Sequence, residues 1–118
     1  MISLKRIYDQ PSQADGLRIL IDRLWPRGVS QERAAIDVWL KDIAPSPNLR
    51  LWFNHQPDRF KEFSLRYTEE LSNNPKIEEL IQLVDQHPQI TLLYAAKDPD
   101  INHAVVLQKF MENRQSVA

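Results

Sequence analysis

Two short runs of branched apolar residues constrain the fold of this chain more than any other feature. LRILID occupies residues 17–22 and QITLLYAA occupies residues 89–96, and turn-forming residues bound each run. Runs of this length and composition are typical of buried β-strands. The segment between them carries helical patterns, and a helical crossover places two strands parallel in one sheet. We therefore expect the two runs to be parallel neighbours, or nearly so.

A third strand is predicted at residues 2–7 from a weak alternation of side chains. The loop that follows, DQPSQADG at residues 9–16, contains proline, serine, aspartates and glycine and is too short for a full crossover helix. A loop of this length permits an antiparallel arrangement as easily as a parallel one. The direction of the first strand therefore stays open.

Helical segments are predicted where capping residues or prolines precede apolar residues at helical spacing. The predicted starts fall at Ser30, Ser46, Pro57, Asn74 and Asp98. The first segment is expected to be one long helix with a shared apolar face made of Ile36, Trp39, Leu40 and Ile43. The last, with Pro99 in its first turn, is expected to turn His103, Val106, Leu107 and Phe110 inward.

Three strands interleaved with about five helices predict an α/β fold, in which helices cover a small sheet. The chain has 118 residues, the size of one ordinary domain. We expect a single α/β domain over residues 1–114 with a mostly parallel three-stranded sheet. Residues 115–118 are expected to form a frayed C-terminal tail.

Composition excludes several classes of function. The chain has no cysteine, so disulfides, thiolate nucleophiles and sulfur-ligated metals are excluded. Fifteen basic residues against sixteen acidic ones make non-specific nucleic-acid binding an unfavoured role. No apolar run is long enough for a membrane span, and the first residues lack the apolar core of a signal peptide. A cytoplasmic location, no membrane association and no cofactor are therefore expected.

Polar residues follow both of the predicted parallel strands. Asp22, Arg23 and Arg27 come after the first, and Lys97, Asp98 and His103 come after the second. Open α/β sheets bind ligands at the carboxyl ends of their strands, where these two segments would meet. The sequence therefore predicts a pocket at this edge of the sheet.

We predict that Arg23, Arg27 and Lys97 bind an anion, because guanidinium and ammonium groups suit phosphate or carboxylate. If the pocket is catalytic, His103 or Asp22 would move a proton. Trp25 and Asp98 are expected to line the pocket.

Each role has a structural alternative. The arginines could pair internally with Asp22, Asp37 or Asp42, and Trp25 could pack at the rim of the core. His103 could lie at the core edge, and Asp98 could cap a helix. Asp22, Asp98 and His103 lack the tight spacing of metal ligands, so no metal site is predicted.

Three long phrases carry a resemblance to a known family. They are ILIDRLWPRGVS, AAIDVWLKDIAPSPNLRLWFNHQPDRF and TLLYAAKDPDINHAVVL. Together they resemble the YeaO-like branch of domain-of-unknown-function family 488. The resemblance implies a compact bacterial-type α/β protein whose biochemical activity is not settled. A broader branch of the family has cysteines in and after the final strand, where this chain has Tyr94, Ala95, Ala96 and Lys97. A thiol-dependent role is therefore not carried over.

Two hypotheses follow for function. The first is an anion-binding pocket for a small phosphate or carboxylate, which a small-molecule enzyme could use. The second is a non-catalytic interaction or regulatory module that binds protein or DNA. The sequence leaves the ligand and the oligomeric state open.

Overall fold

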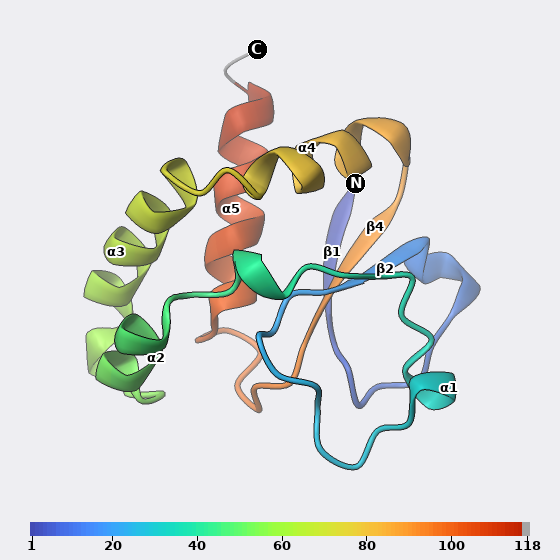
Figure 1. The fold of residues 1–118 in the computed structure, drawn as a ribbon, viewed down its shortest axis with the longest axis horizontal. Helices are drawn as coiled ribbons and strands as arrows, with labels where there is room; N and C mark the ends of the chain where they lie inside the picture. Colours follow the sequence, from blue (N-terminus) through green and yellow to red (C-terminus); the bar gives the residue numbers. More distant parts are fainter. Residues whose placement is uncertain (117–118) are drawn as a thin grey trace.

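A parallel four-stranded sheet forms the centre of the molecule, in the order β1-β4-β2-β3. Its strands β1, β4 and β2 are labelled in Figure 1. The computed structural model describes residues 1–116. The strands are β1 (Ile2–Arg6), β2 (Leu17–Leu20), β3 (Val38–Trp39) and β4 (Ile90–Tyr94). All three pairings between neighbouring strands are parallel. The direction of β1, which the sequence leaves open, is therefore parallel to β4.

The predicted pairing of the two apolar runs is confirmed. β2 and β4 lie side by side and parallel, with Leu17 opposite Ile90 and Leu20 opposite Leu93. Every residue of β4 is buried, because strands lie on both of its sides and apolar side chains cover both of its faces. The carboxyl ends of β2 and β4 therefore open on the same edge of the sheet.

The prediction of three strands and of one long helix after Ser30 is wrong. Ser30 does cap a helix, since its Oγ accepts a hydrogen bond from Arg33 N, but α1 (Gln31–Ala34) ends after one turn at left-handed Ala35. The following residues form β3, which pairs with the outer edge of β2. Backbone groups of β2 gain partners in this way, and Leu40 N donates to Leu20 O at 2.9 Å. Pairing with the sheet thus prevails over helical spacing.

Of the middle helices, the first begins at its predicted cap, whereas the next two begin two or three residues after the predicted starts at Pro57 and Asn74. Ser46 Oγ accepts a hydrogen bond from Leu49 N at the start of α2 (Pro47–Phe53). A 3₁₀ turn at Pro57–Arg59 leads into α3 (Phe60–Ser72). Asn74 precedes α4 (Ile77–Gln86), and its Oδ1 accepts from Lys76 N. With α1 and the last helix, five α-helices lie within residues 1–116, as expected.

The last helix, α5 (His103–Ser116), begins later than predicted. Asp98 does not cap it. The Asp98 side chain instead accepts hydrogen bonds from Asp100 N and Ile101 N and stabilises a turn. Asn102 caps the helix by accepting a hydrogen bond from Val105 N at 3.1 Å. Of the tail that was expected to fray, residues 117 and 118 lie outside the described residues.

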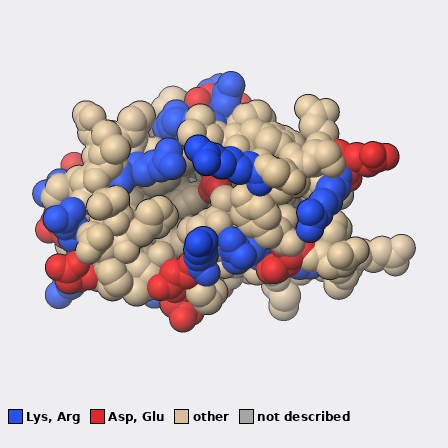
Figure 2. All heavy atoms as spheres, turned by 90° about the horizontal axis from the view of Figure 1, so that it is seen from below, with Lys and Arg blue, Asp and Glu red and all other residues tan. Residues whose placement is uncertain are grey.

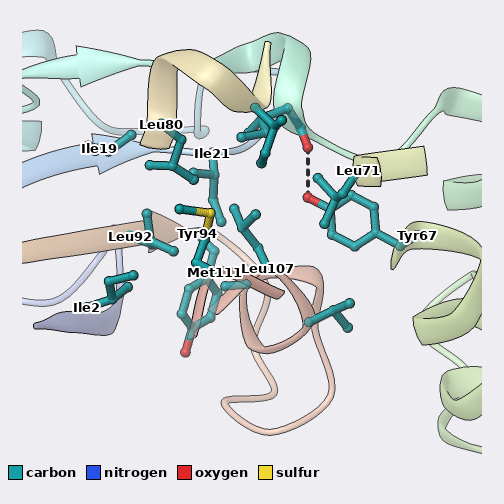
Figure 3. Close-up of a cluster of buried hydrophobic side chains, with 14 of the residues drawn as sticks. Ile2, Ile19, Ile21, Tyr67, Leu71, Leu80, Leu92, Tyr94, Leu107 and Met111 are labelled. Carbon is teal, nitrogen blue, oxygen red and sulfur yellow. Dashed lines mark hydrogen bonds between the residues drawn. The ribbon is translucent and has the colours of Figure 1, made fainter. Parts of the chain in front are cut away.

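Alternating residues of the strands face two apolar clusters. Ile19, Leu92 and Tyr94 belong to the larger cluster, which side chains of α3, α4 and α5 complete (Figure 3). Within it, Tyr67 donates its hydroxyl to Ile43 O at 2.7 Å. Burial, together with nearby carboxylates, raises the pKa of Tyr67 well above its usual range, so the phenol stays a neutral donor.

The smaller cluster lies on the other face, where Leu20 and Leu93 pack with Ala34 of α1. Beside it, Asp15 and Arg18 form a buried ion pair, to which Lys5 adds a contact at 3.1 Å. Arg18 also donates to the carbonyls of residues 34 and 35 at the end of α1. The charged group of Lys5, Asp15 and Arg18 therefore links β1, β2 and α1.

Candidate functional site

A pocket of about 700 Å³ opens at the carboxyl ends of β2 and β4. Its walls are the loop after β2, the loop between β4 and α5, and the C-terminal end of α2. Figure 2 looks from below and shows a hollow with Lys and Arg side chains around it and acidic atoms inside. We call it the carboxyl-edge pocket.

All seven residues singled out in the sequence line the carboxyl-edge pocket. They are Asp22, Arg23, Trp25, Arg27, Lys97, Asp98 and His103. Two segments about seventy positions apart thus meet because β2 and β4 are parallel neighbours.

Asp22 links the loop after β2 to the loop after β4. Its Oδ2 accepts a hydrogen bond from Ala95 N at 2.9 Å, although the two residues are 73 positions apart. Arg6 also stabilises the loop after β4, because its guanidinium donates to the carbonyls of Ala95 and Ala96 at 3.2 and 2.9 Å. The wall of the pocket after β4 is therefore fixed in place by two charged side chains.

His103 lies against the same carboxylate. Its Nε2 is 3.0 Å from Asp22 Oδ1 and 3.2 Å from Ile21 O. Hydrogen-bond geometry is satisfied only toward Ile21 O, and Asp22 Oδ1 accepts no hydrogen bond within residues 1–116. Because a carbonyl can only accept, Nε2 carries the hydrogen, and its approach to Asp22 is an electrostatic contact. Asp22 and His103 are thus already engaged by the protein itself.

Replacing Asp22 with alanine is expected to lower the free energy of unfolding by about 2 kcal/mol, since a part-buried bond to a charged acceptor is lost. Asp22→Asn keeps an oxygen for Ala95 N and should lose less. Urea denaturation measures both, and Asp85→Ala, an exposed acid on α4, is the control with a change within about 0.5 kcal/mol. Equal stability of Asp22→Ala and Asp85→Ala would show that the hydrogen bond between Asp22 and Ala95 does not stabilise the fold.

Arg23 has an unused hydrogen-bonding group. Its Nη2 donates to the carbonyls of Ala44 and Pro45, both at the long distance of 3.3 Å. Its Nε is buried and has no hydrogen-bond partner within residues 1–116. A buried N–H of a cation without an acceptor is costly. The Nε–H group of Arg23 therefore stays unsatisfied inside the fold of residues 1–116, while the residue itself lines the pocket.

The other predicted residues differ in how many contacts they make within the protein. Arg27 and Lys97 are exposed at the pocket. Trp25 packs edge-to-face on Trp39, and its Nε1 donates to Val29 O at 2.7 Å. Asp98 is engaged in its own turn. Two cations thus remain open to solvent, whereas Trp25 and Asp98 have structural partners.

Arg50, His55 and Tyr8 also line the pocket, and sequence reasoning missed them. α2 ends at Phe53 and is followed by Asn54 and His55, both left-handed, at φ 47° and 54°. An asparagine after a helix is a recognisable cap signal, but a second left-handed residue has no sequence signature. The sequence therefore predicts the end of α2 and does not predict that this corner reaches the pocket.

Positive charge is in excess at the carboxyl-edge pocket. Four permanent cations, Arg23, Arg27, Arg50 and Lys97, face two carboxylates, Asp22 and Asp98, in a chain whose net charge is −1. Within residues 1–116, none of the four cations forms an ion pair. Internal pairing of Arg23 and Arg27 with Asp22, Asp37 or Asp42, the alternative considered from the sequence, does not occur.

Metal ligands do not cluster in the described part of the chain. Over residues 1–116, no group of three or more His, Asp or Glu side chains is arranged to hold a metal ion. Nor is any helix in that range long and apolar enough to cross a membrane.

The fold and pocket define a class of protein: a small α/β protein with a parallel four-stranded sheet and a cationic pocket at its carboxyl edge. The chain belongs to the DUF488 family, since residues 1–117 match the group described as the inactive DUF488-N3 subclade. The resemblance seen in the sequence is thereby confirmed.

Similar proteins occur in Escherichia coli and in Mycobacterium tuberculosis. Uncharacterised protein YeaO of Escherichia coli K12 is 38% identical over 112 residues, which cover 95% of this chain and 97% of YeaO. Uncharacterised protein Rv3073c of Mycobacterium tuberculosis H37Rv is 37% identical over 113 residues, covering 96% of this chain and 95% of the relative. No solved structure matches the chain.

Proposed function

We propose that this protein binds a small anion, a phosphate or a carboxylate, in the carboxyl-edge pocket without transforming it. The observation that carries the proposal is the set of four cations around one pocket, none of them ion-paired within residues 1–116. Cations held close together repel one another, and a bound anion relieves that repulsion. Arg23, Arg27 and Lys97 would donate hydrogen bonds to the anion, and Arg50 would add charge from α2.

A non-catalytic role is supported by the chemistry of the lining. Within residues 1–116, the lining residues include no serine, threonine or cysteine that could serve as a nucleophile. The imidazole of His103 and the carboxylate of Asp22 are engaged with backbone groups, which suits a structural role better than proton transfer. The description of the family subclade as inactive agrees with this reading.

A small ligand fits these observations better than DNA does. The cations gather around a hollow, and a concave site encloses a small molecule (Figure 2). A net charge of −1 over the whole chain disfavours contact with a long phosphate backbone. A gel-shift series at increasing salt concentration is therefore expected to detect little DNA binding.

Anion binding is tested by thermal shift with inorganic phosphate, nucleoside monophosphates and simple carboxylates, followed by isothermal titration calorimetry. Arg23→Ala combined with Arg27→Ala should weaken binding by about tenfold or more, because charge-assisted hydrogen bonds are lost. The control is Arg33→Ala with Arg114→Ala, which removes the same charge from exposed arginines outside the pocket.

Half-buried Arg23 also contributes contacts to the fold, so a second double variant, Arg27→Ala with Lys97→Ala, changes only exposed residues. It is expected to weaken binding as well, with an unchanged circular dichroism spectrum. If the wild type responds to these anions no more than either pocket variant does, the proposal fails.

A further inference from the structure

The carboxyl-edge pocket is larger and more apolar than an inorganic anion needs. Eleven of its twenty lining residues are apolar or aromatic, and its volume of about 700 Å³ lies in the range of pockets that hold drug-sized organic ligands. A bare phosphate would contact the cations and leave the apolar part of the lining in water. The shape of the pocket therefore indicates a ligand with an apolar body.

Two stacked phenylalanines contribute to the apolar lining. Phe53 of α2 and Phe63 of α3 are 5% and 2% exposed, and their ring centroids lie 4.2 Å apart at an angle of 18°. Phe53 also lies against the ring of His55, with centroids 6.2 Å apart. Buried, stacked rings are fixed before any ligand arrives, so the small part of them that reaches the pocket forms a rigid aromatic wall beside exposed His55.

Leu24 contributes an apolar side chain at the mouth of the pocket. It is 64% exposed, although it stands between the functional candidates Arg23 and Trp25. An exposed leucine at a pocket gains stability when an apolar group of a ligand covers it. A ligand that lies on Leu24 would keep its charged group within reach of the neighbouring cations.

We propose that the ligand is an anion that carries an aromatic ring, an aryl phosphate or an aryl carboxylate. Arg23, Arg27 and Lys97 hold the charged group, and the ring lies between Leu24 and the rings of Phe53 and His55. This inference rests on the proposed function of the pocket. It adds that the apolar body, and not the charge alone, determines which anion binds.

Isothermal titration calorimetry with two matched pairs of probes tests the inference: phenyl phosphate against methyl phosphate, and benzoate against acetate. Burial of a phenyl ring should make the aryl member of at least one pair bind about tenfold tighter or more. The pair that responds identifies the charged group. Equal affinities within both pairs would overturn the inference and leave anion binding intact, whereas no binding of any probe would overturn both.

Leu24→Ser tests the placement of the ring. It should weaken phenyl phosphate or benzoate binding about threefold or more and leave methyl phosphate or acetate binding unchanged. Leu65→Ser is the matched control, because Leu65 is 63% exposed and lies outside the pocket. An aryl preference that persists undiminished in Leu24→Ser would contradict this placement.

Discussion

Alanine at position 16 is expected to lower the free energy of unfolding by about 3 kcal/mol or more, since backbone strain and a steric clash add together. Gly16 has φ +65° and ψ −138°, a conformation that side chains disfavour. A Cβ there would lie 2.2 Å from Gln89 O, which also accepts the hydrogen bond of Leu17 N. Relief of the clash would separate β2 from β4 at the start of their pairing.

Gly28→Ala is the matched control for Gly16→Ala. Gly28 also has a positive φ, +74°, but a Cβ there would meet nothing within 4 Å. Gly28→Ala should therefore lower the free energy of unfolding only by the conformational cost of a positive φ, about 1 kcal/mol. Urea denaturation followed by tryptophan fluorescence measures both variants. Equal losses would show that contact with Gln89 is not what requires glycine at position 16.

Asp15→Asn is expected to lower the free energy of unfolding by about 3 kcal/mol, because it leaves a buried arginine without its counter-charge. Asp15 is bonded to Arg18, Ser12 N and Lys5, and Arg18 is only 4% exposed. Glu62→Gln is the control, since it breaks an ion pair with Arg66 whose side chains are both 51% exposed. That surface pair should contribute less than about 1 kcal/mol.

The same ion pair predicts how stability depends on pH. Burial of Asp15 opposes its ionisation, but the hydrogen bond from Ser12 N and the cations Lys5 and Arg18 outweigh it and lower its pKa below the ordinary 3.8. A lowered pKa in the folded state stabilises the protein above pH 3.8, and this contribution is lost as the pH falls through the folded-state value. Denaturation between pH 5 and about 2 should therefore show a flatter pH dependence for Asp15→Asn than for the wild type.

Patterns that depend on local chemistry predicted the fold well. The apolar runs of β2 and β4 and the Ser46 cap of α2 lie where the sequence indicates, whereas Asn74 accepts a hydrogen bond from Lys76 N ahead of α4 and does not cap it. The prediction of a helix after Ser30 was wrong because the spacing of its apolar residues also fits a short helix followed by a strand. Ile36 and Ile43 are at helical spacing, yet they pack in different apolar clusters on either side of the sheet.

Part of the candidate site could be predicted, because parallel strands bring their carboxyl ends together. This rule placed Asp22 and Arg27 beside Lys97 and His103. It could not place Arg50 or His55, since their approach depends on how α2 packs against α3 and on two left-handed residues. Nor could it show that Asp22 is bonded to Ala95, a contact that requires three-dimensional geometry.

The bond between Asp22 and Ala95 has a consequence for the order of events during folding. It joins residues 73 positions apart, so the carboxyl-edge pocket has no native walls until β2 and β4 have paired across that whole interval. Closure of so long an interval is slow compared with helix formation. In a polypeptide emerging from the ribosome, the carboxyl-edge pocket would therefore form only after β4 has been synthesised.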